Sequence, residues 1–331
     1  MTDFIINKQP SFWKEKLTNQ EFNVLVKRGT DPAFHNKYDS HYEQGIYVCQ
    51  ACDQVLFSSE DKYKSGSGWP SFSNTIKPKA AVTRSDRKLA VERKEILCSR
   101  CGGHLGHVFE DGPQPTGLRY CINSSSMKFL KNAYLASGCF WGPDAYFGGL
   151  EGVYFTASGY MGGELEDPSY HNLGHHTETV RISYDPEIIS FSELLKHFWK
   201  IHNPLSPTYS TQYKSLIFYT DQTQKDKARD FITKKKNHTD NEVFTEIKKG
   251  EIFYPAEDYH QHYQLRKNQN LNQYIKELTN LGEDKNYSRI LTKMNAYSSG
   301  NLNQNLILQE LKISYLKLID EQLIDSITSN L

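Results

Sequence analysis

Two C-x-x-C motifs constrain the fold of this chain more than any other feature of its sequence. They place four cysteines in two matched pairs, Cys49 with Cys52 and Cys98 with Cys101. Each pair can bind one side of a tetrahedral zinc ion through its thiolates. The sequence therefore predicts a Zn2+ site formed by these four residues. Because four thiolates complete the coordination shell, we expect this zinc to be structural and not catalytic.

The same four cysteines have two other uses to weigh, a redox dithiol and a zinc ribbon that binds nucleic acid. Redox chemistry needs only one pair, so two matched pairs favour zinc. The chain carries 39 Lys and Arg against 39 Asp and Glu, and this zero net charge argues against a nucleic-acid partner. Residues 1–16 show no secretory signal, so we expect reduced cysteines and a cytoplasmic location.

The two remaining cysteines, Cys121 and Cys139, stand alone and are predicted to be nucleophiles. Cys139 lies in a Gly-Cys-Phe-Trp-Gly turn, between a strand-like segment at 133–137 and a helix expected from Trp141 onward. Free N–H groups and the helix dipole at such an N-terminus stabilise a thiolate. The alternative for either cysteine is a small buried hydrophobe.

The length of 331 residues is enough for two domains. Residues 1–130 contain a helix that begins with a capping box at Thr18 and Glu21 and is expected to end at Gly29. Short strand-like segments at 45–48, 90–92 and 95–97, with Gly- and Ser-rich turns around them, predict a mainly β, zinc-stabilised domain. Residues 128–132 are the candidate linker. No segment approaches the ~18 apolar residues of a membrane span, so no membrane partner is expected.

Residues 131–285 alternate strand-like and helical segments, which predicts an α/β domain of two-layer, ferredoxin-like architecture. We expect strands at 133–137, 153–159, 178–184, 214–219 and 243–247. Helices are expected at 190–201, where Ser190 and Glu193 form a capping box, and at 222–236.

Residues 286–331 are expected to form a short helical extension. Apolar residues with three-and-four spacing predict an amphipathic helix there: Leu308, Leu311, Tyr315, Leu318, Ile319, Leu323 and Ile327. We expect this helix to pack on the second domain, and a dimer or partner contact is the alternative.

Residues 12–129 resemble the methionine sulfoxide reductase B family. The resemblance rests on the two C-x-x-C motifs and on the stretches Gly68-Trp69-Pro70-Ser71-Phe72, His104-Leu105-Gly106-His107-Val108-Phe109, Asp111-Gly112-Pro113-Gln114-Pro115-Thr116-Gly117 and Arg119-Tyr120-Cys121-Ile122-Asn123-Ser124. It implies that Cys121 is the nucleophile and that Trp69 packs against the substrate methyl group. It also implies that His104, His107 and Asn123 line the site, and we expect His107 to act as the proton donor.

Residues 133–267 are similar to the methionine sulfoxide reductase A family. The matching stretches are Gly138-Cys139-Phe140-Trp141-Gly142, Gly159-Tyr160-Met161-Gly162-Gly163, His176-Thr177-Glu178, Gln212-Tyr213-Lys214-Ser215 and Ala256-Glu257-Asp258-Tyr259-His260-Gln261. The similarity implies that Cys139 attacks, that Glu178 supplies a proton, and that two pairs of aromatic residues bind the substrate. Phe140 and Trp141 would enclose the methyl group, and Tyr160 and Tyr213 would hydrogen-bond the sulfoxide oxygen.

The chain departs from the two family patterns at three positions. Ser67 stands where many reductases of the B type carry a resolving cysteine. In the second domain, Asp144 replaces a common glutamate, and Thr208 occupies the position of an acidic residue. Cys139 is also the last cysteine of the chain, so the C-terminal resolving cysteines of many relatives are absent.

Together the resemblances imply a bifunctional methionine sulfoxide reductase for repair after oxidative damage. The R epimer would react at the first domain and the S epimer at the second, through cysteine sulfenic acids, with oxidised proteins or free methionine sulfoxide as substrates. Zinc and the two nucleophiles account for all six cysteines, so an external thiol is expected to reset both sites, either thioredoxin or glutathione with glutaredoxin. A disulfide between Cys121 and Cys139 is the internal alternative. A zinc-stabilised binding module with one or both reductase sites degenerate is the alternative function.

Overall fold

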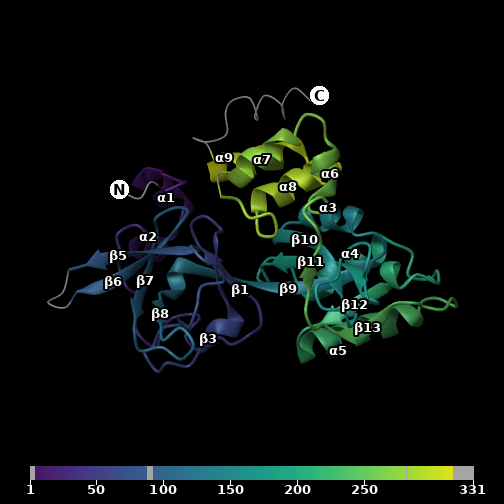
Figure 1. Cartoon of the computed structure of the whole chain (residues 1–331), viewed down its shortest axis with the longest axis horizontal. Coiled ribbons are helices and arrows are strands. Elements are labelled where there is room, and N and C mark those ends of the chain that lie inside the picture. Colours follow the sequence, from purple (N-terminus) through teal and green to yellow (C-terminus); the bar gives the residue numbers. More distant parts are fainter. Residues whose placement is uncertain (1–3, 88–91, 281, 316–331) are drawn as a thin grey trace. The chain divides into compact units, whose positions relative to one another are not determined.

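The computed structural model describes residues 4–87, 92–280 and 282–315. The chain divides into two compact units, Met1–Leu130 and Lys131–Leu331 (Figure 1). The first unit is rich in strands, the second mixes helices with a sheet, and further helices follow toward the C-terminus. This is the broad architecture that the sequence predicts. Within the described ranges, no helix is long and apolar enough to cross a membrane.

The first unit begins with two short helices, α1 (Pro10–Lys16) and α2 (Asn19–Leu25). The predicted capping box is present, because the Glu21 backbone N–H donates to Thr18 Oγ1 and the Thr18 N–H donates to the Glu21 carboxylate. The helix ends at Leu25, earlier than expected. Gly29 lies in the turn that follows, where its N–H donates to the carbonyl of Asn23 at 2.8 Å.

A six-stranded antiparallel sheet forms most of the first unit. Its order is β3-β4-β8-β7-β6-β5, with strands β3 (Lys62–Tyr63), β4 (Ser71–Phe72), β5 (Ala81–Asp86), β6 (Arg93–Cys98), β7 (His104–Phe109) and β8 (Arg119–Ile122). Strands β1 (Ile46–Cys49) and β2 (Val55–Ser58) pair separately. Their buried side chains share one core with the larger sheet. The predicted strands at 45–48 and 95–97 match β1 and β6, whereas most of the segment at 90–92 lies outside the described residues.

Strand β9 (Met127–Ser137) crosses the boundary between the two units. Its first residues pair with β1, and residues from Lys131 onward pair with β11 (Thr177–Tyr184) and β12 (Ser215–Tyr219). The boundary between the two units therefore lies within the candidate linker at 128–132, but these residues are strand and not an irregular connection. They include no Gly or Pro to interrupt the extended backbone, and both halves of β9 have hydrogen-bonding partners.

The sheet of the second unit has the order β13-β12-β9-β11-β10-β14. The further elements are α3 (Trp141–Gly148), β10 (Val153–Met161), α4 (Phe191–Lys200), η3 (Thr211–Tyr213), α5 (Gln222–Lys236), β13 (Glu246–Lys249) and β14 (Tyr254–Pro255). The Ser190–Glu193 capping box and the helix at 222–236 are confirmed. The last predicted strand, 243–247, is shifted, since β13 begins at Glu246.

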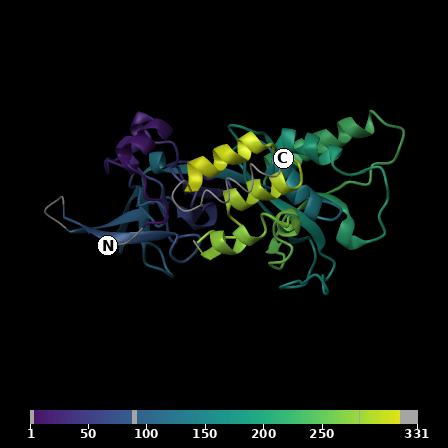
Figure 2. The ribbon, with the colours of Figure 1, turned by 90° about the horizontal axis from the view of Figure 1, so that it is seen from above.

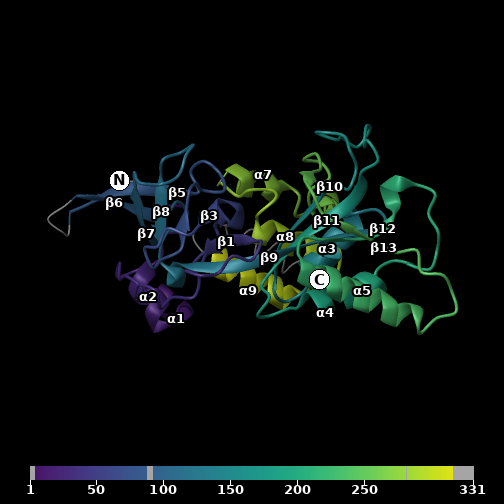
Figure 3. The same ribbon diagram turned by 90° about the horizontal axis from the view of Figure 1, so that it is seen from below.

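Alternate residues of these strands face opposite sides of the sheet, as the period of two requires. Ala133, Leu135, Ile182 and Ile217 share one apolar core with side chains of α3, α4 and α5. Figure 3 shows α4 and α5 together beside this sheet. The opposite face carries a smaller cluster that contains Ala136, Met161, Leu216 and Phe218. The helical layer therefore covers one face, and α3 reaches it directly from the end of β9.

The helices after the sheet have a core of their own. They are α6 (Tyr263–Lys267), α7 (Gln273–Asn280), α8 (Arg289–Ser298) and α9 (Gln304–Tyr315), at the yellow-green end of the ribbon (Figure 2). Leu311 of the predicted amphipathic stripe is buried in this core, and Leu308 packs against it. Tyr315 ends α9. The remaining members of the stripe, Leu318, Ile319, Leu323 and Ile327, lie outside the described residues.

Candidate active sites and metal centre

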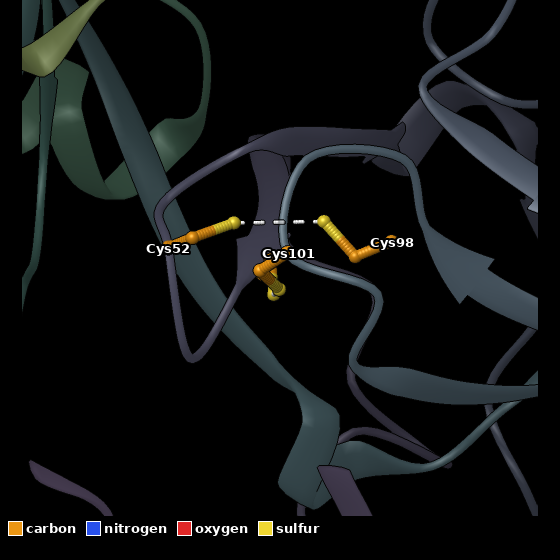
Figure 4. A group of neighbouring side chains, drawn as sticks. Cys52, Cys98 and Cys101 are labelled. Atoms are coloured by element: carbon orange, nitrogen blue, oxygen red, sulfur yellow. Dashed lines mark hydrogen bonds between the residues drawn. The ribbon is translucent and has the colours of Figure 1, made fainter. Parts of the chain in front are cut away.

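The four cysteines of the C-x-x-C motifs meet at one point of the first unit. Their Sγ atoms all lie within 4.8 Å of one another, with Cys49 and Cys101 at 3.8 Å and Cys52 and Cys98 at 3.5 Å. Figure 4 shows the sulfurs of Cys52 and Cys98 directed toward each other, with Cys101 beside them. A tetrahedral ion with Zn–S bonds of about 2.3 Å separates its ligands by about 3.8 Å. The donor set and its spacing therefore fit a tetrahedral metal ion.

Two equivalent turns create this arrangement. Each begins where a strand ends, at Cys49 of β1 and at Cys98 of β6, and in each turn an N–H four positions on returns to the carbonyl of that cysteine at 2.9 Å. Asp53 and Gly102 supply these N–H groups, and both have positive φ, 60° and 70°. The matched turns present both cysteines of each pair on the same side.

Cys121 lies on β8, between β4 and β7. Its register partners are His107 on β7 and Ser71 on β4, so the three side chains share one face of the sheet. The thiol is partly buried, and Ser67 Oγ lies 3.9 Å from Cys121 Sγ. The backbone of Gly106 passes so close to the Cys121 carbonyl that a Cβ would collide with it. This glycine therefore sets how closely β7 approaches the strand that carries the thiol.

Burial raises the pKa of the Cys121 thiol, and two neighbours oppose this effect. Ser67 and Arg119 both lower the pKa of Cys121, through a hydrogen bond from the serine and through the charge of the guanidinium. Arg119 is held in place by Asp111, which accepts hydrogen bonds from Nε and Nη2 at 2.9 and 2.8 Å. The first site thus supplies its thiol with a fixed positive charge and a hydroxyl donor.

His107 shares the face of Cys121 and is tied to a carboxylate. Its Nε2 lies 2.9 Å from Asp86 Oδ2, and Arg93 donates to the same oxygen at 2.9 Å. Burial lowers the pKa of His107, and the hydrogen bond with Asp86 opposes that shift. The Asp86 carboxylate therefore holds the His107 ring in place, while burial favours its neutral form.

His104 is fully buried and packs against His107, with ring centroids 5.6 Å apart. Its Nδ1 lies 2.7 Å from Glu95, which also accepts from Arg84 at 2.6 Å. Burial alone would raise the pKa of Glu95, but the hydrogen bonds from His104 and Arg84 hold that pKa at about 2. His104 is therefore fixed in orientation by an ionised carboxylate.

Trp69 and Asn123 are both anchored to one residue, Asp31. The indole N–H of Trp69 donates to the Asp31 carbonyl at 2.8 Å, and the Asp31 N–H donates to Asn123 Oδ1 at 2.8 Å. The amide of Asn123 also donates to the carbonyl of Leu105 at 3.0 Å. The oxygen of Asn123 is thus engaged within the fold, and this side chain connects β8 to the segment that orients Trp69.

Cys139 follows β9 and precedes α3, and it is the exposed cysteine among the six. Partial enclosure of the thiol raises the pKa of Cys139, the backbone N–H of Trp141 lowers it, and the nearby Glu178 carboxylate raises it. The free N–H at the start of the helix is present, as the sequence predicts. The net direction is upward, so the expectation that the helix end alone secures a thiolate is too simple.

Glu178 lies on β11 with only 1% of its surface exposed. Its Oε2 accepts the N–H of Phe140 at 3.0 Å, and its Oε1 accepts the side-chain amide of Gln212 at 2.7 Å. Burial raises the pKa of Glu178, and these two donors lower it. The carboxyl group is therefore held beside the residue that follows Cys139, in surroundings that favour its protonated form.

Aromatic side chains surround the start of α3. Phe140 is buried, with its ring centroid 5.9 Å from that of Tyr160 and 5.1 Å from that of His260. The indole N–H of Trp141 donates to His260 Nδ1 at 3.1 Å, and its ring stacks on Tyr263 at 3.7 Å with an interplanar angle of 6°. The orientation of Trp141 is thereby set from both its edge and its face.

The two tyrosines expected to bind oxygen differ in their surroundings. Tyr160 is buried, and its hydroxyl donates to Glu257 Oε2 at 2.8 Å. Tyr213 is exposed, and a hydrogen bond with Tyr170 is the main cause that raises its pKa, with Glu178 and Cys139 adding to it. Tyr213 therefore lies close enough to both Glu178 and Cys139 for their charges to affect its pKa.

Thr208 and Asp144, the two positions at which the second unit departs from the family pattern, have different surroundings in the structure. Thr208 is exposed, and its hydroxyl closes a local turn with Ser210. Asp144 is fully buried and accepts from the side chain of Asn295 at 2.9 Å. Gln212, and not a residue from the Thr208 loop, contacts the buried carboxyl of Glu178.

The structure adds several residues to each site that the sequence did not assign. The added residues of the second unit lie inside the motif stretches that match the reductase A family, so the motifs could have identified them. These residues are Gln212, Glu257 and His260. Those in the first unit lie far from the nucleophile in sequence and have no local pattern that reveals them: Asp31, Asp86 and Glu95.

Comparison with known proteins matches each of the two units to a protein family. Residues 17–131 match the SelR domain, and residues 131–293 match the family described as peptide methionine sulfoxide reductase. The peptide methionine sulfoxide reductase MsrB of Leptospira interrogans is 52% identical over 129 residues, which is 39% of this chain and 98% of that protein. The MsrB of Methanosarcina mazei is 49% identical over 126 residues, 38% of this chain and 90% of that protein.

Among solved structures, methionine sulfoxide reductase A of Corynebacterium diphtheriae is 31% identical, with 42% of this chain and 75% of that chain covered and a TM-score of 0.38. The two family matches are contiguous and meet at residue 131, where the two compact units also meet. The chain therefore belongs to the peptide methionine sulfoxide reductases, oxidoreductases that reduce methionine sulfoxide to methionine, and it joins a domain of the MsrB type to one of the MsrA type.

Proposed function

We propose that the first unit reduces the R epimer of methionine sulfoxide and the second unit the S epimer, with Cys121 and Cys139 as the nucleophiles. The two epimers require separate enzymes, and this chain carries one domain of each type. The observation that carries the proposal is that each unit holds one cysteine outside the metal cluster, next to a group able to donate a proton. That group is His107 beside Cys121 and Glu178 beside Cys139.

The reaction transfers one oxygen atom from the sulfoxide to the enzyme. The thiolate attacks the sulfoxide sulfur and forms an S–S bond to it while the oxygen gains a proton. The hydroxyl then passes to the cysteine sulfur as the S–O bond of the substrate and the new S–S bond break, so methionine leaves and the cysteine becomes a sulfenic acid. A reducing thiol then forms a mixed disulfide with the cysteine and releases water. A second thiol breaks that disulfide and restores the cysteine. A general acid is worth on the order of 10²–10⁴ in rate.

In the second unit, Glu178 is the proposed acid, oriented by Gln212 and the N–H of Phe140. Phe140 and Trp141 form the apolar enclosure for the substrate methyl group. Tyr213 and Tyr160 are the proposed donors to the sulfoxide oxygen. The Tyr160 hydroxyl donates its one proton to Glu257 in this structure, so it would exchange that hydrogen bond for one to the sulfoxide oxygen when substrate binds.

In the first unit, His107 is the proposed proton donor, and Asp86 supports its protonated form. Trp69 is the proposed contact for the substrate methyl group. His104 and Asn123 line the site, and both are oriented by hydrogen bonds to buried partners.

The four clustered cysteines are the proposed ligands of a structural zinc ion. Their number, their burial and their spacing support it, and four thiolates leave no position for a substrate. When bound, the ion would cross-link the turns after β1 and β6, which belong to different sheets of the first unit.

An external thiol is the proposed reductant, either thioredoxin or glutathione with glutaredoxin. Ser67 Oγ lies 3.9 Å from the Cys121 thiol, where a cysteine would form a disulfide, but a hydroxyl cannot. Oxidised proteins and free methionine sulfoxide are both proposed as substrates. Dependence on small or protein thiols fits a reducing compartment such as the cytoplasm.

The proposed domain limits are 1–130, 131–285 and 286–331. Within the second domain, β9, α3, β10, β11, α4 and β12 follow one another as β-α-β-β-α-β, with antiparallel neighbours in the order β12-β9-β11-β10. This order supports the proposed ferredoxin-like architecture.

The assignment of each epimer is tested with wild type, Cys121→Ser and Cys139→Ser, using dithiothreitol as reductant. We expect Cys121→Ser to abolish reduction of the R epimer alone and Cys139→Ser that of the S epimer alone, because serine keeps the shape but not the nucleophile. Chromatography of each pure epimer measures the rates. Retention of either activity in its own variant would refute the corresponding assignment.

The role of Glu178 is tested through the pH dependence of S-epimer reduction. A general acid works when protonated, so activity falls as pH rises through the pKa of Glu178, which burial places above that of an exposed glutamate. We expect Glu178→Gln to lower kcat by about 10²–10⁴-fold and to remove this descending limb. Reduction of the R epimer by the same variant is the internal control. A descending limb that survives in the variant would exclude Glu178 as the acid.

The absence of a resolving thiol at position 67 is tested with Ser67→Cys and the matched control Ser67→Ala. After one turnover of the R epimer without reductant, wild type and the alanine variant should gain one oxygen atom, as a sulfenic acid. The cysteine variant should instead lose two hydrogen atoms as a disulfide forms with Cys121. Intact-mass spectrometry distinguishes the products. A cysteine variant that carries the added oxygen and no disulfide would contradict this geometry.

The zinc proposal is tested by metal analysis and by Cys98→Ser, with Cys121→Ser as the matched control. We expect one zinc per chain in the wild type and in the control, and its loss in Cys98→Ser. Loss of even ~2 kcal/mol would lower the Tm of a domain of this size by roughly 10 °C. S-epimer reduction should persist, since the second unit has its own core. Stoichiometric zinc in Cys98→Ser would show that the cluster is not the metal site.

A further inference from the structure

Helix α8 is unusual because seven successive residues, from Ile290 to Ala296, are all buried. Three of them carry polar side chains, Thr292, Lys293 and Asn295. Burial of a polar group is costly unless it is hydrogen-bonded. All three find partners in α3 or in segments packed against it, and α8 lies against α3 and β10 on one side and against α6 and α9 on the other (Figure 1).

Lys293 binds the C-terminal end of α3. Its Nζ donates to the carbonyl of Gly148 at 2.7 Å and to that of Leu150 at 3.0 Å. The last carbonyls of a helix have no partner within the helix and carry its negative partial charge, so an ammonium group is well placed there. Burial lowers the pKa of Lys293 to about 8, which leaves most of it protonated at neutral pH. Lys293 therefore caps the helix from a distant segment.

Asn295 binds the first turn of the same helix. Its Nδ2 donates to Asp144 Oδ2 at 2.9 Å, and its Oδ1 accepts the N–H of Leu265 in α6 at 3.0 Å. Asp144 is completely buried, so this amide is a specific partner that solvent cannot replace. Asn295 thus joins the start of α3 to both α6 and α8.

The contact between the two helices leaves little room for a side chain on α3. A Cβ at Gly148 would lie 3.0 Å from the carbonyl oxygen of Thr292, and one at Gly149 would collide with the carbonyl of Asn301. Thr292 Oγ1 also accepts the N–H of Thr156 in β10 at 3.2 Å. The C-terminal end of α3 is therefore fixed against the backbone of α8 and of the loop that follows it.

The other end of α3 contacts both proposed reacting groups, Cys139 and Glu178. The N–H of Trp141 lowers the pKa of Cys139, and the N–H of Phe140 donates to Glu178. A shift or rotation of α3 changes both contacts together, because both N–H groups belong to its start. The residues that fix the position of α3 along its axis therefore also fix the positions of these two N–H groups relative to the Cys139 thiol and the Glu178 carboxyl group.

We propose that α8 positions α3 for reduction of the S epimer, with Lys293 and Asn295 as positioning residues that act through the helix. Asn295 lies beyond residue 293, where the match to the peptide methionine sulfoxide reductase family ends. In this proposal the C-terminal helices contribute to the second site by positioning α3. The inference rests on the proposed role of Cys139 as the nucleophile.

The test compares Lys293→Met and Asn295→Leu, which keep side-chain size and remove the donors, with Ile307→Val. Ile307 lies in the core of the C-terminal helices, so its variant loosens that core without removing a hydrogen bond to α3. We expect the two donor variants to lower kcat for the S epimer by about tenfold with KM changed less than threefold, since small misplacements are expensive in rate. Lys293→Arg should restore most of the activity. R-epimer reduction by the same chains is the internal control.

A second readout follows the reactivity of Cys139 itself. Alkylation of Cys139 as a function of pH, followed by peptide mapping, should shift to higher pH in the donor variants, because a displaced Trp141 N–H no longer stabilises the thiolate. A purely structural role would lower the unfolding temperature and leave this profile unchanged. If kcat and the alkylation profile match wild type, the inference is overturned.

The controls separate this inference from the proposal on which it rests. Cys139→Ser is assayed in parallel, and retention of S-epimer reduction in it refutes the role of Cys139 itself. Loss of activity in Cys139→Ser with normal kcat in the donor variants refutes only the role of α8. Should Asn295→Leu lose its cooperative thermal transition, Lys293→Met and Lys293→Gln decide the question by the same criteria.

Discussion

A thiol that attacks a sulfoxide must be withdrawn from water and still be able to ionise, and both sites are organised around this conflict. Burial raises the pKa of Cys121 and of Cys139 alike. The groups that oppose it differ because the secondary structure differs. A strand paired on both edges, such as β8, commits its N–H groups to the sheet, so Cys121 relies on the side chains of Ser67 and Arg119. Cys139 precedes a helix, whose first N–H groups are free, and the backbone itself assists.

The same division extends to the proposed proton donors. His107 lies on a strand and is held by a carboxylate from the neighbouring region of the sheet, Asp86. Glu178 also lies on a strand, but one of its oxygens is held by the backbone N–H of Phe140 just before the helix. In the second unit, one short junction therefore contacts both the Cys139 thiol and the carboxyl group of its proposed acid, Glu178.

The sequence predicted those features whose causes are local. The capping boxes at Thr18 and Ser190 and the limits of α5 depend on residues a few positions apart, and the two C-x-x-C turns depend on four-residue spacing. The strand at the candidate linker was not predicted, because strand continuity depends on pairing partners far along the chain. The hydrogen bond between Asn295 and Asp144 joins residues 151 positions apart, and no periodic pattern in the sequence predicts it. Motif resemblance supplied the proposed reacting residues, and only the fold shows which groups orient them.

The hydroxyl of Ser67 has a consequence for the lifetime of the enzyme under stress. Where a second thiol stands beside the nucleophile, a sulfenic acid is trapped within the protein as a disulfide, which peroxide attacks far less readily. With serine in that place, the sulfenic acid of the proposed cycle stays open until a reductant arrives from solution. Further oxidation to the sulfinic acid is irreversible for most proteins. In the proposed cycle the first site would therefore depend on a well-supplied thiol pool, and a cell that exhausts that pool would lose the repair enzyme together with the proteins it repairs.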